Sequence, residues 1–536
     1  MRCRDKRWAW PACDNPCMMT WKCLFLAFVV GCSGGASTSD GSMDTPSDGV
    51  VDAFVDAAPD AVRDAGVQLS KMTYVKPSNR GGQFAPVAIS GDGNTFVVGA
   101  SAEASAAMGI NGNQQDTSTP FTGAAYVFVR SGSSWVQQAY LKSSSSVTGK
   151  RFGWTVSISG DGNTIAVASI FESSVAGDSG AVYVFTRTGS AWTEQAMLKA
   201  SNPETYDGFA NSLALSTDGQ TLIVGANGED SASNMINGDQ SDNSAPHAGA
   251  AYVFVRNANV WTIQAYLKAS NARAAAGFGR SVATAGNGNV VVVGSQGESS
   301  AATGVDGAQT FSGGAQASGA AYVFTRTNTT WAQTAYIKAS NTRASTHFGW
   351  AVALSSDATT LAVGAPQEAS AASGIDGDQS SVTAPSSGAV YVFARSGGTW
   401  VQQAYAKASN PDTGDFFAEA IALSADGSRL IVGAAEEDGG SSALNGNQQD
   451  NSVDGSGAAY VFGRSGSTWT QLVYAKAINP GNSDSFGSSP DGHDIAVSGD
   501  GSLFAIGAMF ETGSGTGVGS VPDDLGPGSG AVYLLE

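Results

Sequence analysis

Residues 348–366 read FGWAVALSSDATTLAVGAP, and residues 388–410 read GAVYVFARSGGTWVQQAYAKASN. Close variants of the first phrase recur seven times, each followed by a version of the second, and corresponding residues are mostly 69 or 70 positions apart. The first phrase begins at Phe84, Phe152, Phe209, Phe278, Phe348, Phe417 and Phe486. A fixed period of this length is typical of one supersecondary unit that packs on copies of itself. The repeat therefore decides the fold.

Each copy predicts four short strands. In the copy that begins at Phe152, apolar residues alternate with small or polar ones, and Asp161-Gly162 has the composition of a hairpin turn. The four predicted strands of this copy are residues 153–159, 164–168, 181–185 and 192–200. Because no copy contains a long run with helical periodicity, the sequence predicts an all-β, seven-bladed β-propeller over residues 71–536.

The two ends of the repeat region indicate a closed ring. The last copy stops after its third strand, residues 530–535, and lacks the fourth. Residues 74–79, YVKPSN, match the end of a fourth strand elsewhere, YLKASN at 266–271. We expect this N-terminal strand to complete the last blade, since a closed ring leaves no sheet edge unpaired between its ends.

Composition limits the classes of partner. The formal net charge of −19 argues against nucleic acid and anionic membrane surfaces, and it leaves room for cations. All cysteines lie in the first 32 residues, so neither disulfides nor thiolate metal sites hold the repeats together. They are Cys3, Cys13, Cys17, Cys23 and Cys32.

The N-terminus resembles a targeting signal. Residues 23–31 form an apolar stretch after Lys22 that is too short to span a bilayer as a helix and fits the core of a signal peptide over residues 1–32. Val29-Val30-Gly31-Cys32 resembles the bacterial lipobox, whose cysteine is lipidated. Ordinary secretion, an uncleaved anchor and a chance match are the alternatives, and translation could start at Met18 or Met19. We expect an exported cell-envelope lipoprotein at the outer membrane or cell surface, or else a secreted protein.

Residues 33–70 predict an Asp-rich disordered linker. An aspartate recurs at every fourth position from Asp40 to Asp64. On a helix these like charges would repel at i,i+4, and Pro46 and Pro59 weigh further against a helix. An extended tether follows from this composition, and an acidic calcium-binding tract is the alternative.

Two charged residues recur in all seven copies. A glutamate follows the V-G-A phrase, and a lysine lies near the end of the fourth strand. The glutamates are Glu103, Glu172, Glu229, Glu298, Glu368, Glu437 and Glu511. The lysines are Lys76, Lys142, Lys199, Lys268, Lys338, Lys407 and Lys476. Because the second and fourth strands of a blade end at the same rim, we predict a structural ring of Glu–Lys pairs or Glu-to-backbone bonds that ties the blades together. A ring of metal ligands is the alternative.

Two more repeated side chains have structural interpretations. A tryptophan on the fourth strand predicts packing between blades, with ligand stacking as the alternative. These residues are Trp135, Trp192, Trp261, Trp331, Trp400 and Trp469. An aspartate in the first turn, such as Asp161, is expected to accept hydrogen bonds from the backbone of its own turn.

The loops between the second and third strands vary most between copies. Four of them contain a similar phrase at residues 111–116, 237–242, 376–379 and 445–450, and 306–309 is a weaker fifth. Side-chain oxygens in these loops could coordinate calcium or bind sugar hydroxyls, and an Asx turn that orders the loop is the alternative. The candidate ligand or metal residues are Asn111, Asp116, Asp239, Asp242, Asp376, Asp378, Asn445 and Asp450.

The repeat resembles the FG-GAP family, the β-propeller of integrin α-subunits and many bacterial surface proteins. Phe348-Gly349 and Gly364-Ala365-Pro366 carry both halves of that name, and the resemblance covers about residues 71–536. It implies that ligands bind on the face that carries the variable loops. Many members bind calcium in an acidic turn between the first two strands. Here that turn holds one carboxylate, whereas calcium takes about six to eight oxygen ligands, so no cofactor is certain and calcium is the one candidate.

The sequence supports two classes of function. The first is a noncatalytic cell-envelope binding or adhesion module that presents loops on one propeller face to a protein or glycan, and that meets the membrane only through a lipid anchor. The second is a propeller hydrolase or lyase that acts on polysaccharide. Since His247, His347 and His493 share no repeat position and no nucleophile or phosphate-loop motif is present, we predict that the protein is not an enzyme and has no catalytic residues.

Overall fold

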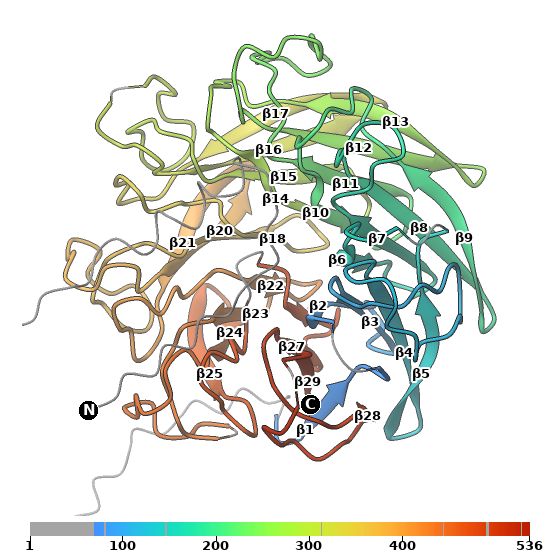
Figure 1. The fold of residues 1–536 in the computed structure, drawn as a ribbon. Helices are drawn as coiled ribbons and strands as arrows, with labels where there is room; N and C mark the ends of the chain where they lie inside the picture. Colours follow the sequence, from blue (N-terminus) through green and yellow to red (C-terminus); the bar gives the residue numbers. More distant parts are fainter. Residues whose placement is uncertain are drawn as a thin grey trace, which may run out of the picture. The chain divides into compact units, whose positions relative to one another are not determined.

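The structure, a computed structural model, describes residues 69–79, 82–144, 147–311, 313–442, 444–488, 492–526 and 528–536. These residues form one compact unit in which seven antiparallel β-sheets are arranged in a ring (Figure 1). The predicted seven-bladed β-propeller is confirmed. The predicted signal peptide, its Cys32 and the linker lie outside the described residues and stay predictions. No helix in the described ranges is long and apolar enough to cross a membrane.

Each blade has the same strand order, from the middle of the ring outward. The first strands are β2 (Phe84–Ile89), β6 (Phe152–Ile158), β10 (Phe209–Leu215), β14 (Phe278–Thr284), β18 (Val352–Leu354), β22 (Ile421–Leu423) and β26 (Ile495–Val497). The second strands are β3 (Thr95–Ala100), β7 (Thr164–Ser169), β11 (Thr221–Ala226), β15 (Val290–Ser295), β19 (Thr360–Ala365), β23 (Arg429–Ala434) and β27 (Phe504–Ala508). The third strands are β4 (Ala124–Ser131), β8 (Ala181–Thr188), β12 (Ala250–Asn257), β16 (Ala320–Thr327), β20 (Ala389–Ser396), β24 (Ala458–Ser465) and β29 (Ala531–Leu535). The fourth strands are β5 (Ser134–Leu141), β9 (Ala191–Leu198), β13 (Val260–Leu267), β17 (Thr330–Ile337), β21 (Thr399–Ala406), β25 (Thr468–Ala475) and β1 (Met72–Lys76).

This order sends the connections to two opposite faces. Short turns join the first strand to the second and the third strand to the fourth on one face. The long loops between second and third strands share the other face with the connections from each blade to the next. We call this second face the loop face.

The N-terminal strand closes the ring in the last blade, which in Figure 1 joins the blue and red ends of the chain. Strand β1 pairs with β29 in a register that places Tyr74 opposite Tyr533. One feature differs from the prediction of four strands: this blade has a fifth, β28 (Gly517–Val518), which pairs with the outer edge of β1. The long loop before β29 supplies it, and the extra pairing covers an edge that would otherwise be open.

Glycines let the backbones of neighbouring blades touch. Gly99, in the V-G-A phrase of the first blade, lies against Gly153, in the F-G phrase of the second, and a Cβ on Gly99 would lie 2.1 Å from the Gly153 carbonyl oxygen. Gly153 also has a φ of +87°, in the region that favours glycine. The same contact joins Gly225 to Gly279. The two halves of the repeated phrase are therefore the two sides of one blade-to-blade contact.

The hydrophobic core lies between blades. Phe152 packs edge-on against Tyr183 at 5.4 Å between ring centroids, in a buried cluster that includes residues of the first two blades. The strand-four tryptophans are buried at the same interfaces, and Trp192 Nε1 donates to Gln138 of the preceding blade at 2.9 Å. The predicted role of these tryptophans in packing between blades is confirmed.

We predict that closure by β1 is essential for stability. A chain without residues 1–77 should lose several kcal/mol of unfolding free energy, because burial of Tyr74 and Val75 alone contributes roughly 1.5–3 kcal/mol for each side chain. A chain without residues 1–68 keeps every described residue and serves as the control. Guanidinium unfolding followed by tryptophan fluorescence measures the difference, and equal midpoints for the two chains would contradict the role of β1.

Candidate functional site

Each blade buries one glutamate at the loop face. All seven of the repeated glutamates are at most 1% exposed. In each, a carboxylate oxygen accepts from the backbone N–H two residues later, at 2.9–3.2 Å. A buried carboxylate is strongly destabilising unless charge and hydrogen bonds compensate it, so the remaining donors around it determine what the ring can do.

A lysine of the same blade compensates the charge in six blades. Lys338 Nζ lies 2.7 Å from Glu298, and the other five pairs span 2.6–3.0 Å. The five other lysines are Lys76, Lys142, Lys268, Lys407 and Lys476. Burial lowers the pKa of Lys338, while the carboxylate of Glu298 acts in the opposite direction. The pair joins the second strand to the fourth strand of one sheet.

The prediction that Glu–Lys pairs tie neighbouring blades together is therefore wrong for the lysines. The contact between blades comes instead from the asparagine of the K-A-S-N phrase, whose amide donates to the glutamate of the next blade. Asn271 Nδ2 lies 3.0 Å from Glu298, and Asn410 Nδ2 lies 2.9 Å from Glu437. The same bond is made by Asn79, Asn202, Asn341 and Asn479.

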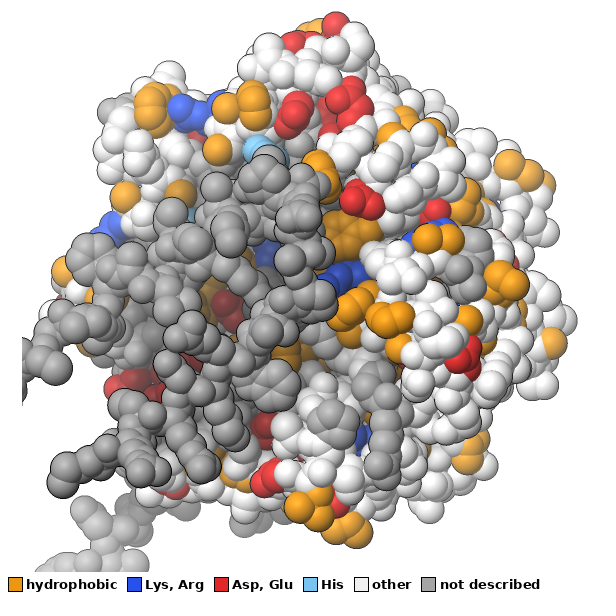
Figure 2. All heavy atoms as spheres, in the orientation of Figure 1, with side chains coloured by type: hydrophobic (Ala, Val, Ile, Leu, Met, Phe, Trp, Pro, Cys, Tyr) orange, Lys and Arg blue, Asp and Glu red, His pale blue; other side chains and the backbone are white. Residues whose placement is uncertain are grey.

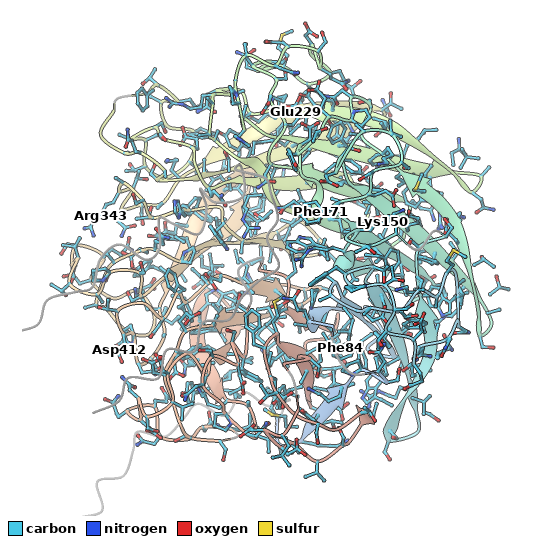
Figure 3. All side chains as sticks on the ribbon, viewed as in Figure 1. Phe84, Lys150, Phe171, Glu229, Arg343 and Asp412 are labelled. Atoms are coloured by element: carbon cyan, nitrogen blue, oxygen red, sulfur yellow. The ribbon has the colours of Figure 1, made fainter. Side chains whose placement is uncertain are left out.

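The second blade departs from this pattern. Lys199 does not pair with the carboxylate of Glu172; its Nζ binds the Glu172 carbonyl oxygen and Ser179 Oγ, both at 3.1 Å. Lys150, from the connection that precedes the blade, pairs with the Glu172 carboxylate instead, with its Nζ at 2.6 Å. Figure 3 shows Lys150 near Phe171, whose N–H donates to the Lys150 carbonyl oxygen. The connection to this blade, residues 142–151, contains no asparagine, and the Lys150 ammonium is a donor to the Glu172 carboxylate instead.

The candidate loop residues have hydrogen-bond partners within their own blade, either on the fourth strand or in the loop itself. Asn111 has a φ of 57°, and its Oδ1 accepts from the N–H of Tyr140 on the fourth strand at 2.9 Å. Asp376 and Asn445 accept in the same way from Tyr405 and Tyr474. The remaining candidates, Asp116, Asp239, Asp242, Asp378 and Asp450, each accept from the N–H two residues later. This is the geometry of Asx turns.

The same loops also contact the preceding blade. Gln309 Oε1 accepts from Ser270 Oγ at 2.6 Å, and Gln379 accepts from Ser340 at the same distance. Arg343 adds bonds to three carbonyl oxygens in the loop of the next blade, including that of Ser381 at 2.8 Å. The repeated loop phrase therefore orders the loop face.

The first turns do not fit a calcium ion. In each of the turns headed by Asp92, Asp161, Asp218, Asp357, Asp426 and Asp500, one carboxylate oxygen accepts from a backbone N–H of the turn at 2.9–3.0 Å. The preceding serine, such as Ser159 beside Asp161, also donates to this carboxylate. Across the described ranges, no three His, Cys, Asp or Glu side chains are grouped so that they could hold a metal ion.

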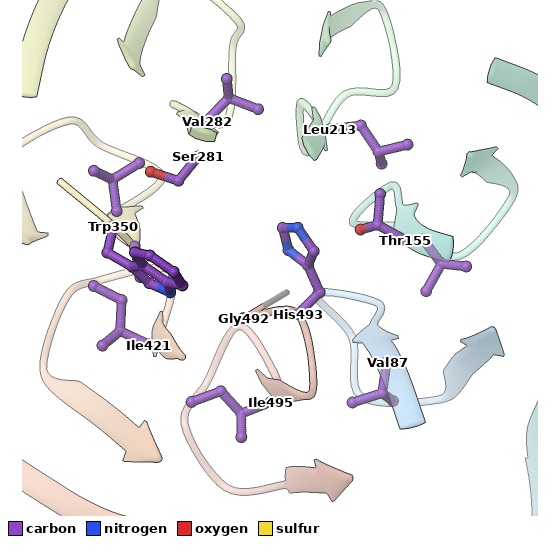
Figure 4. Close-up of a pocket in the computed structure, with 13 residues that line it drawn as sticks. Val87, Thr155, Leu213, Ser281, Val282, Trp350, Ile421, Gly492, His493 and Ile495 are labelled. Carbon is purple, nitrogen blue, oxygen red and sulfur yellow. The ribbon is translucent and has the colours of Figure 1, made fainter. Parts of the chain in front are cut away.

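A cavity lies where the seven first strands meet. It has a volume of about 150 Å³, and every blade contributes one aliphatic side chain to its wall. These are Val87, Val156, Leu213, Val282, Val352, Ile421 and Ile495. Figure 4 shows the His493 imidazole between Trp350 on one side and Thr155 on the other. The wall of the cavity thus combines a ring of aliphatic side chains with the polar residues Thr155, Ser281, Trp350 and His493.

Two of the polar residues that line the cavity, Trp350 and His493, come from one variable position of the repeat. Two residues before the aliphatic one, each first strand approaches the loop face, and the residue there differs between copies. The seven residues are Ala85, Trp154, Asn211, Arg280, Trp350, Glu419 and His493. The residue before each F-G phenylalanine also varies, yet it has a positive φ of 52–67° in all seven copies. Only two of these are glycines, and a non-glycine residue in this region carries strain of about 1–3 kcal/mol.

Several of these variable side chains contact one another across blades. We call Asn211, Arg280, His347, Trp350 and His493 the mouth cluster. The Arg280 guanidinium lies 4.2 Å from the Trp350 ring centroid, and His347 stacks on the same ring at 5.9 Å. His493 Nε2 lies 3.2 Å from the carbonyl oxygen of Asn211, whose Nδ2 donates to the Arg280 carbonyl oxygen. Figure 2 shows basic and hydrophobic side chains near the middle of one face.

Both histidines of the mouth cluster are neutral at physiological pH. Burial lowers the pKa of His347 to about 4, and the Arg280 charge acts in the same direction. Burial and Arg280 likewise lower the pKa of His493 to about 4, against the hydrogen bond to Asn211. A neutral imidazole whose Nε2 donates to the Asn211 carbonyl keeps an acceptor at Nδ1.

The comparison with protein families agrees with this architecture. The family model described as FG-GAP repeat matches residues 135–185, 192–254 and 331–393. The chain carries FG-GAP repeats. No curated protein matches it. Among solved structures, a candidate 6-phosphogluconolactonase from Bacteroides uniformis is similar, with 11% identity, 77% of this chain and 89% of that chain covered, and a TM-score of 0.42.

The mouth cluster of the FG-GAP propeller could have been found from the sequence. Aligned copies show tryptophan, asparagine, arginine and glutamate at a position that no framework contact fixes, two residues before a repeated aliphatic residue. The signal is variation inside the most repetitive phrase, whereas the predicted site residues lie in the variable loops. His493 was harder to place, because the last copy carries an insertion after Phe486.

Three further acids lie beside the glutamate ring. Asp207, Asp415 and Asp484 stand two residues before the F-G phenylalanine and are at most 4% exposed. Burial raises their pKa values to about 7, 7 and 6, and the neighbouring ring glutamates Glu229, Glu437 and Glu511 act in the same direction. Each accepts one backbone N–H, which opposes the shift.

We predict that the stabilisation contributed by these three acids is lost as the pH rises from about 4 to about 8. The folded pKa values lie above the unfolded value of about 3.9, so the folded state holds more protons in this window. The stabilisation is complete below about pH 4 and is lost through the folded pKa values, at about 1.4 kcal/mol for each pKa unit. Asp415→Asn should flatten the slope of unfolding free energy against pH, and Asp454→Asn is the control, because Asp454 is exposed and is not among the charges that act on the three acids. His347 and His493 act in the opposite direction between about pH 4 and 6.5, because their folded pKa values lie below the unfolded value of about 6.5. The test is therefore the difference between variants, and an Asp415→Asn slope equal to that of the parent would contradict the assignment.

We also predict a large penalty for breaking one ion pair of the ring. Lys338→Met leaves Glu298 buried without its cation and should cost about 3–5 kcal/mol of unfolding free energy. Lys338→Met combined with Glu298→Leu should recover part of the loss, because the uncompensated charge is gone. The control is Lys71→Met, whose partner Glu536 lies 3.6 Å away at the surface and whose loss should cost about 0–1 kcal/mol. Similar urea midpoints for Lys338→Met and Lys71→Met would contradict the buried role.

Proposed function

We propose that this FG-GAP propeller is a noncatalytic binding module that presents its loop face to a protein or glycan ligand. The proposal rests on the different positions of the repeated and the variable residues. The repeated glutamates and lysines are buried in the framework and hold one another, whereas the residues that differ between blades lie at the loop face. A framework of this kind supports variable contacts, as binding surfaces on rigid scaffolds do.

The loop face has the composition of a contact surface. Most of the exposed large hydrophobic side chains in the described residues lie in its loops, among them Met108, Met235, Phe311 and Val382, each more than half exposed. The Arg273 guanidinium lies 3.9 Å from the Phe311 ring centroid, which holds that side chain in place. Loops that are ordered before binding lose less entropy when a partner arrives.

We also propose where the protein is located in the cell. A signal peptide ending near Cys32, a lipid anchor on that cysteine and a tether over residues 33–70 would place the propeller at the cell envelope, clear of the membrane surface. Secretion without an anchor is the alternative. We propose no catalytic role and no obligatory metal; calcium is tested as an additive rather than assumed.

The test combines binding and turnover in one preparation. The full chain is applied to a glycan array and to immobilised extracellular proteins, with calcium and with EDTA, and the same sample is incubated with polysaccharides while released reducing ends are measured. Binding without release supports the module. Sustained release of sugar that a single Asp or Glu substitution abolishes would replace it with the alternative, a polysaccharide hydrolase or lyase.

Variants locate the contact on the loop face. Met235→Ser combined with Phe311→Ser should weaken binding of the identified ligand by at least about tenfold, since each buried apolar side chain contributes roughly 1.5–3 kcal/mol. Val136→Ser combined with Val401→Ser removes equally exposed side chains from fourth strands and should leave binding unchanged. Loss of binding in the second pair alone would place the ligand elsewhere on the propeller.

A further inference from the structure

We propose that the cavity where the first strands meet binds the hydroxyl groups of a small neutral ligand, either a free polyol or the hydroxymethyl end of a neutral sugar. This site is formed by first strands and the residues directly before them, and it is separate from the exposed loop residues of the proposed function. Three observations support it: the wall carries no charge, its polar atoms include both donors and acceptors, and its size and polarity suit hydroxyl groups.

The first observation is that no charged side chain lines the cavity. The 13 lining residues include no aspartate, glutamate, lysine or arginine, and the one titratable side chain among them is that of His493. Burial lowers the pKa of His493 to about 4, so its imidazole is neutral at physiological pH. Arg280, Glu419 and Asp494 lie at or next to the same ring of positions, carry charges of both signs and have interactions of their own. Because burial of a charge without a partner is strongly destabilising, this wall favours a neutral ligand.

The second observation is that the polar atoms of the wall include both donors and acceptors. Trp350 Nε1 is buried without a hydrogen-bond partner in the described residues, and an indole N–H can only donate. His493 Nε2 lies 3.2 Å from the Asn211 carbonyl oxygen, which can only accept, so Nε2 carries the proton and Nδ1 is an acceptor. The hydroxyl of Thr155 can do both. A hydroxyl group of a ligand accepts from the one kind of atom and donates to the other, whereas a carboxylate only accepts and an ammonium group only donates.

These polar residues come from three blades and face one space. Figure 4 shows the His493 imidazole between Trp350 on one side and Thr155 on the other. Gly492 brings the backbone before His493 close to the indole, since a Cβ on Gly492 would lie 3.7 Å from Trp350 Nε1. Thr155 lies within β6, whereas Trp350 precedes β18 and His493 precedes β26. A ligand in this space would therefore contact the second, fifth and seventh blades together.

The third observation is the size and polarity of the space. The cavity has a volume of about 150 Å³, and the seven aliphatic side chains of its wall are 4–9% exposed, so they border open space. A dry, apolar cavity of this volume takes up benzene, which has about six non-hydrogen atoms, whereas a polar one has room for several water molecules. The lining here is more polar than apolar. A ligand that displaces ordered water loses affinity unless it reproduces the hydrogen bonds of that water, and hydroxyl groups reproduce them.

The direct test compares matched probes on the full chain by ligand-observed NMR titration. Glycerol is compared with glycerate and 3-aminopropane-1,2-diol, which keep its carbon body and carry a negative and a positive charge. Methyl glucoside is compared with methyl glucuronoside, in which a carboxylate replaces the hydroxymethyl group. We expect the neutral probe to bind at least tenfold more tightly than its charged analogues. Equal or tighter binding of the charged analogues, or no binding of either neutral probe at millimolar concentrations, would overturn the proposal.

The two sources of the hydroxyl groups are distinguished in the same titrations. Tighter binding of glycerol than of methyl glucoside indicates a free polyol, and the reverse order indicates the end of a sugar. Both results support the site. The Met235 and Phe311 variants leave the lining of the cavity unchanged and should not alter probe binding, so failure of the loop-face function and failure of this site can be told apart.

Removal of the unpaired donor supplies a variant with a matched control. Trp350→Phe keeps an aromatic ring beside Arg280 and His347 but removes the N–H, and it should weaken binding of the neutral probe roughly three- to tenfold. Trp331→Phe makes the same change at a fourth-strand tryptophan whose Nε1 donates to Gln264 of the neighbouring blade, and it should leave binding unchanged. Equal losses in the two variants would show a general effect of packing and overturn the assignment.

Two further measurements do not depend on that variant folding well. Thr155→Val keeps the size of the side chain and removes its hydroxyl, and it should also weaken binding. In the unaltered chain, which has three histidines, a ligand hydroxyl that donates to Nδ1 should shift the imidazole nitrogen signals of His493, while those of the exposed His247 stay unchanged. His493 signals that do not respond to a bound neutral probe would place that probe elsewhere and overturn the proposal.

Discussion

The whole propeller depends on one buried carboxylate in each blade. Glu298 accepts from Lys338 of its own blade, from the N–H of Ser300 in its own loop and from Asn271 of the preceding blade. One side chain thus joins the second strand, the fourth strand and the neighbouring sheet. Because a buried charge that loses one donor is strongly destabilising, each blade must supply the same set of partners. This constraint explains why glutamate, lysine and asparagine recur together along the chain.

Because the repeated residues hold the framework together, the residues at the middle of the ring can differ between blades. The close backbone contact between the V-G-A and F-G phrases, made by two glycines at Gly99–Gly153 and Gly225–Gly279, fixes the start of a first strand, and the positive φ of the residue before the phenylalanine turns the chain into it. Side chains two residues before the cavity wall lie in the first strand or directly before it, yet no repeated contact specifies them. Trp350, Arg280 and His493 occupy equivalent places with different chemistry. Arg280 lies within β14, whereas Trp350 and His493 precede β18 and β26.

Much of this architecture could be predicted from the sequence. The period, the four strands of each copy and the completion of the last blade follow from the repeated phrases; the completing strand was predicted from residues 74–79 and is β1 (Met72–Lys76). The fifth strand, β28, could not be predicted, because two residues in a glycine-rich loop carry no strand pattern. The asparagine bond between blades was missed for another reason: hydrogen-bond partners 27 positions apart, such as Asn271 and Glu298, are visible only when both are placed in space. The pairing of Lys150 with Glu172 could not be predicted either, because Lys150 lies outside the repeated phrases and its partner is visible only in the folded chain.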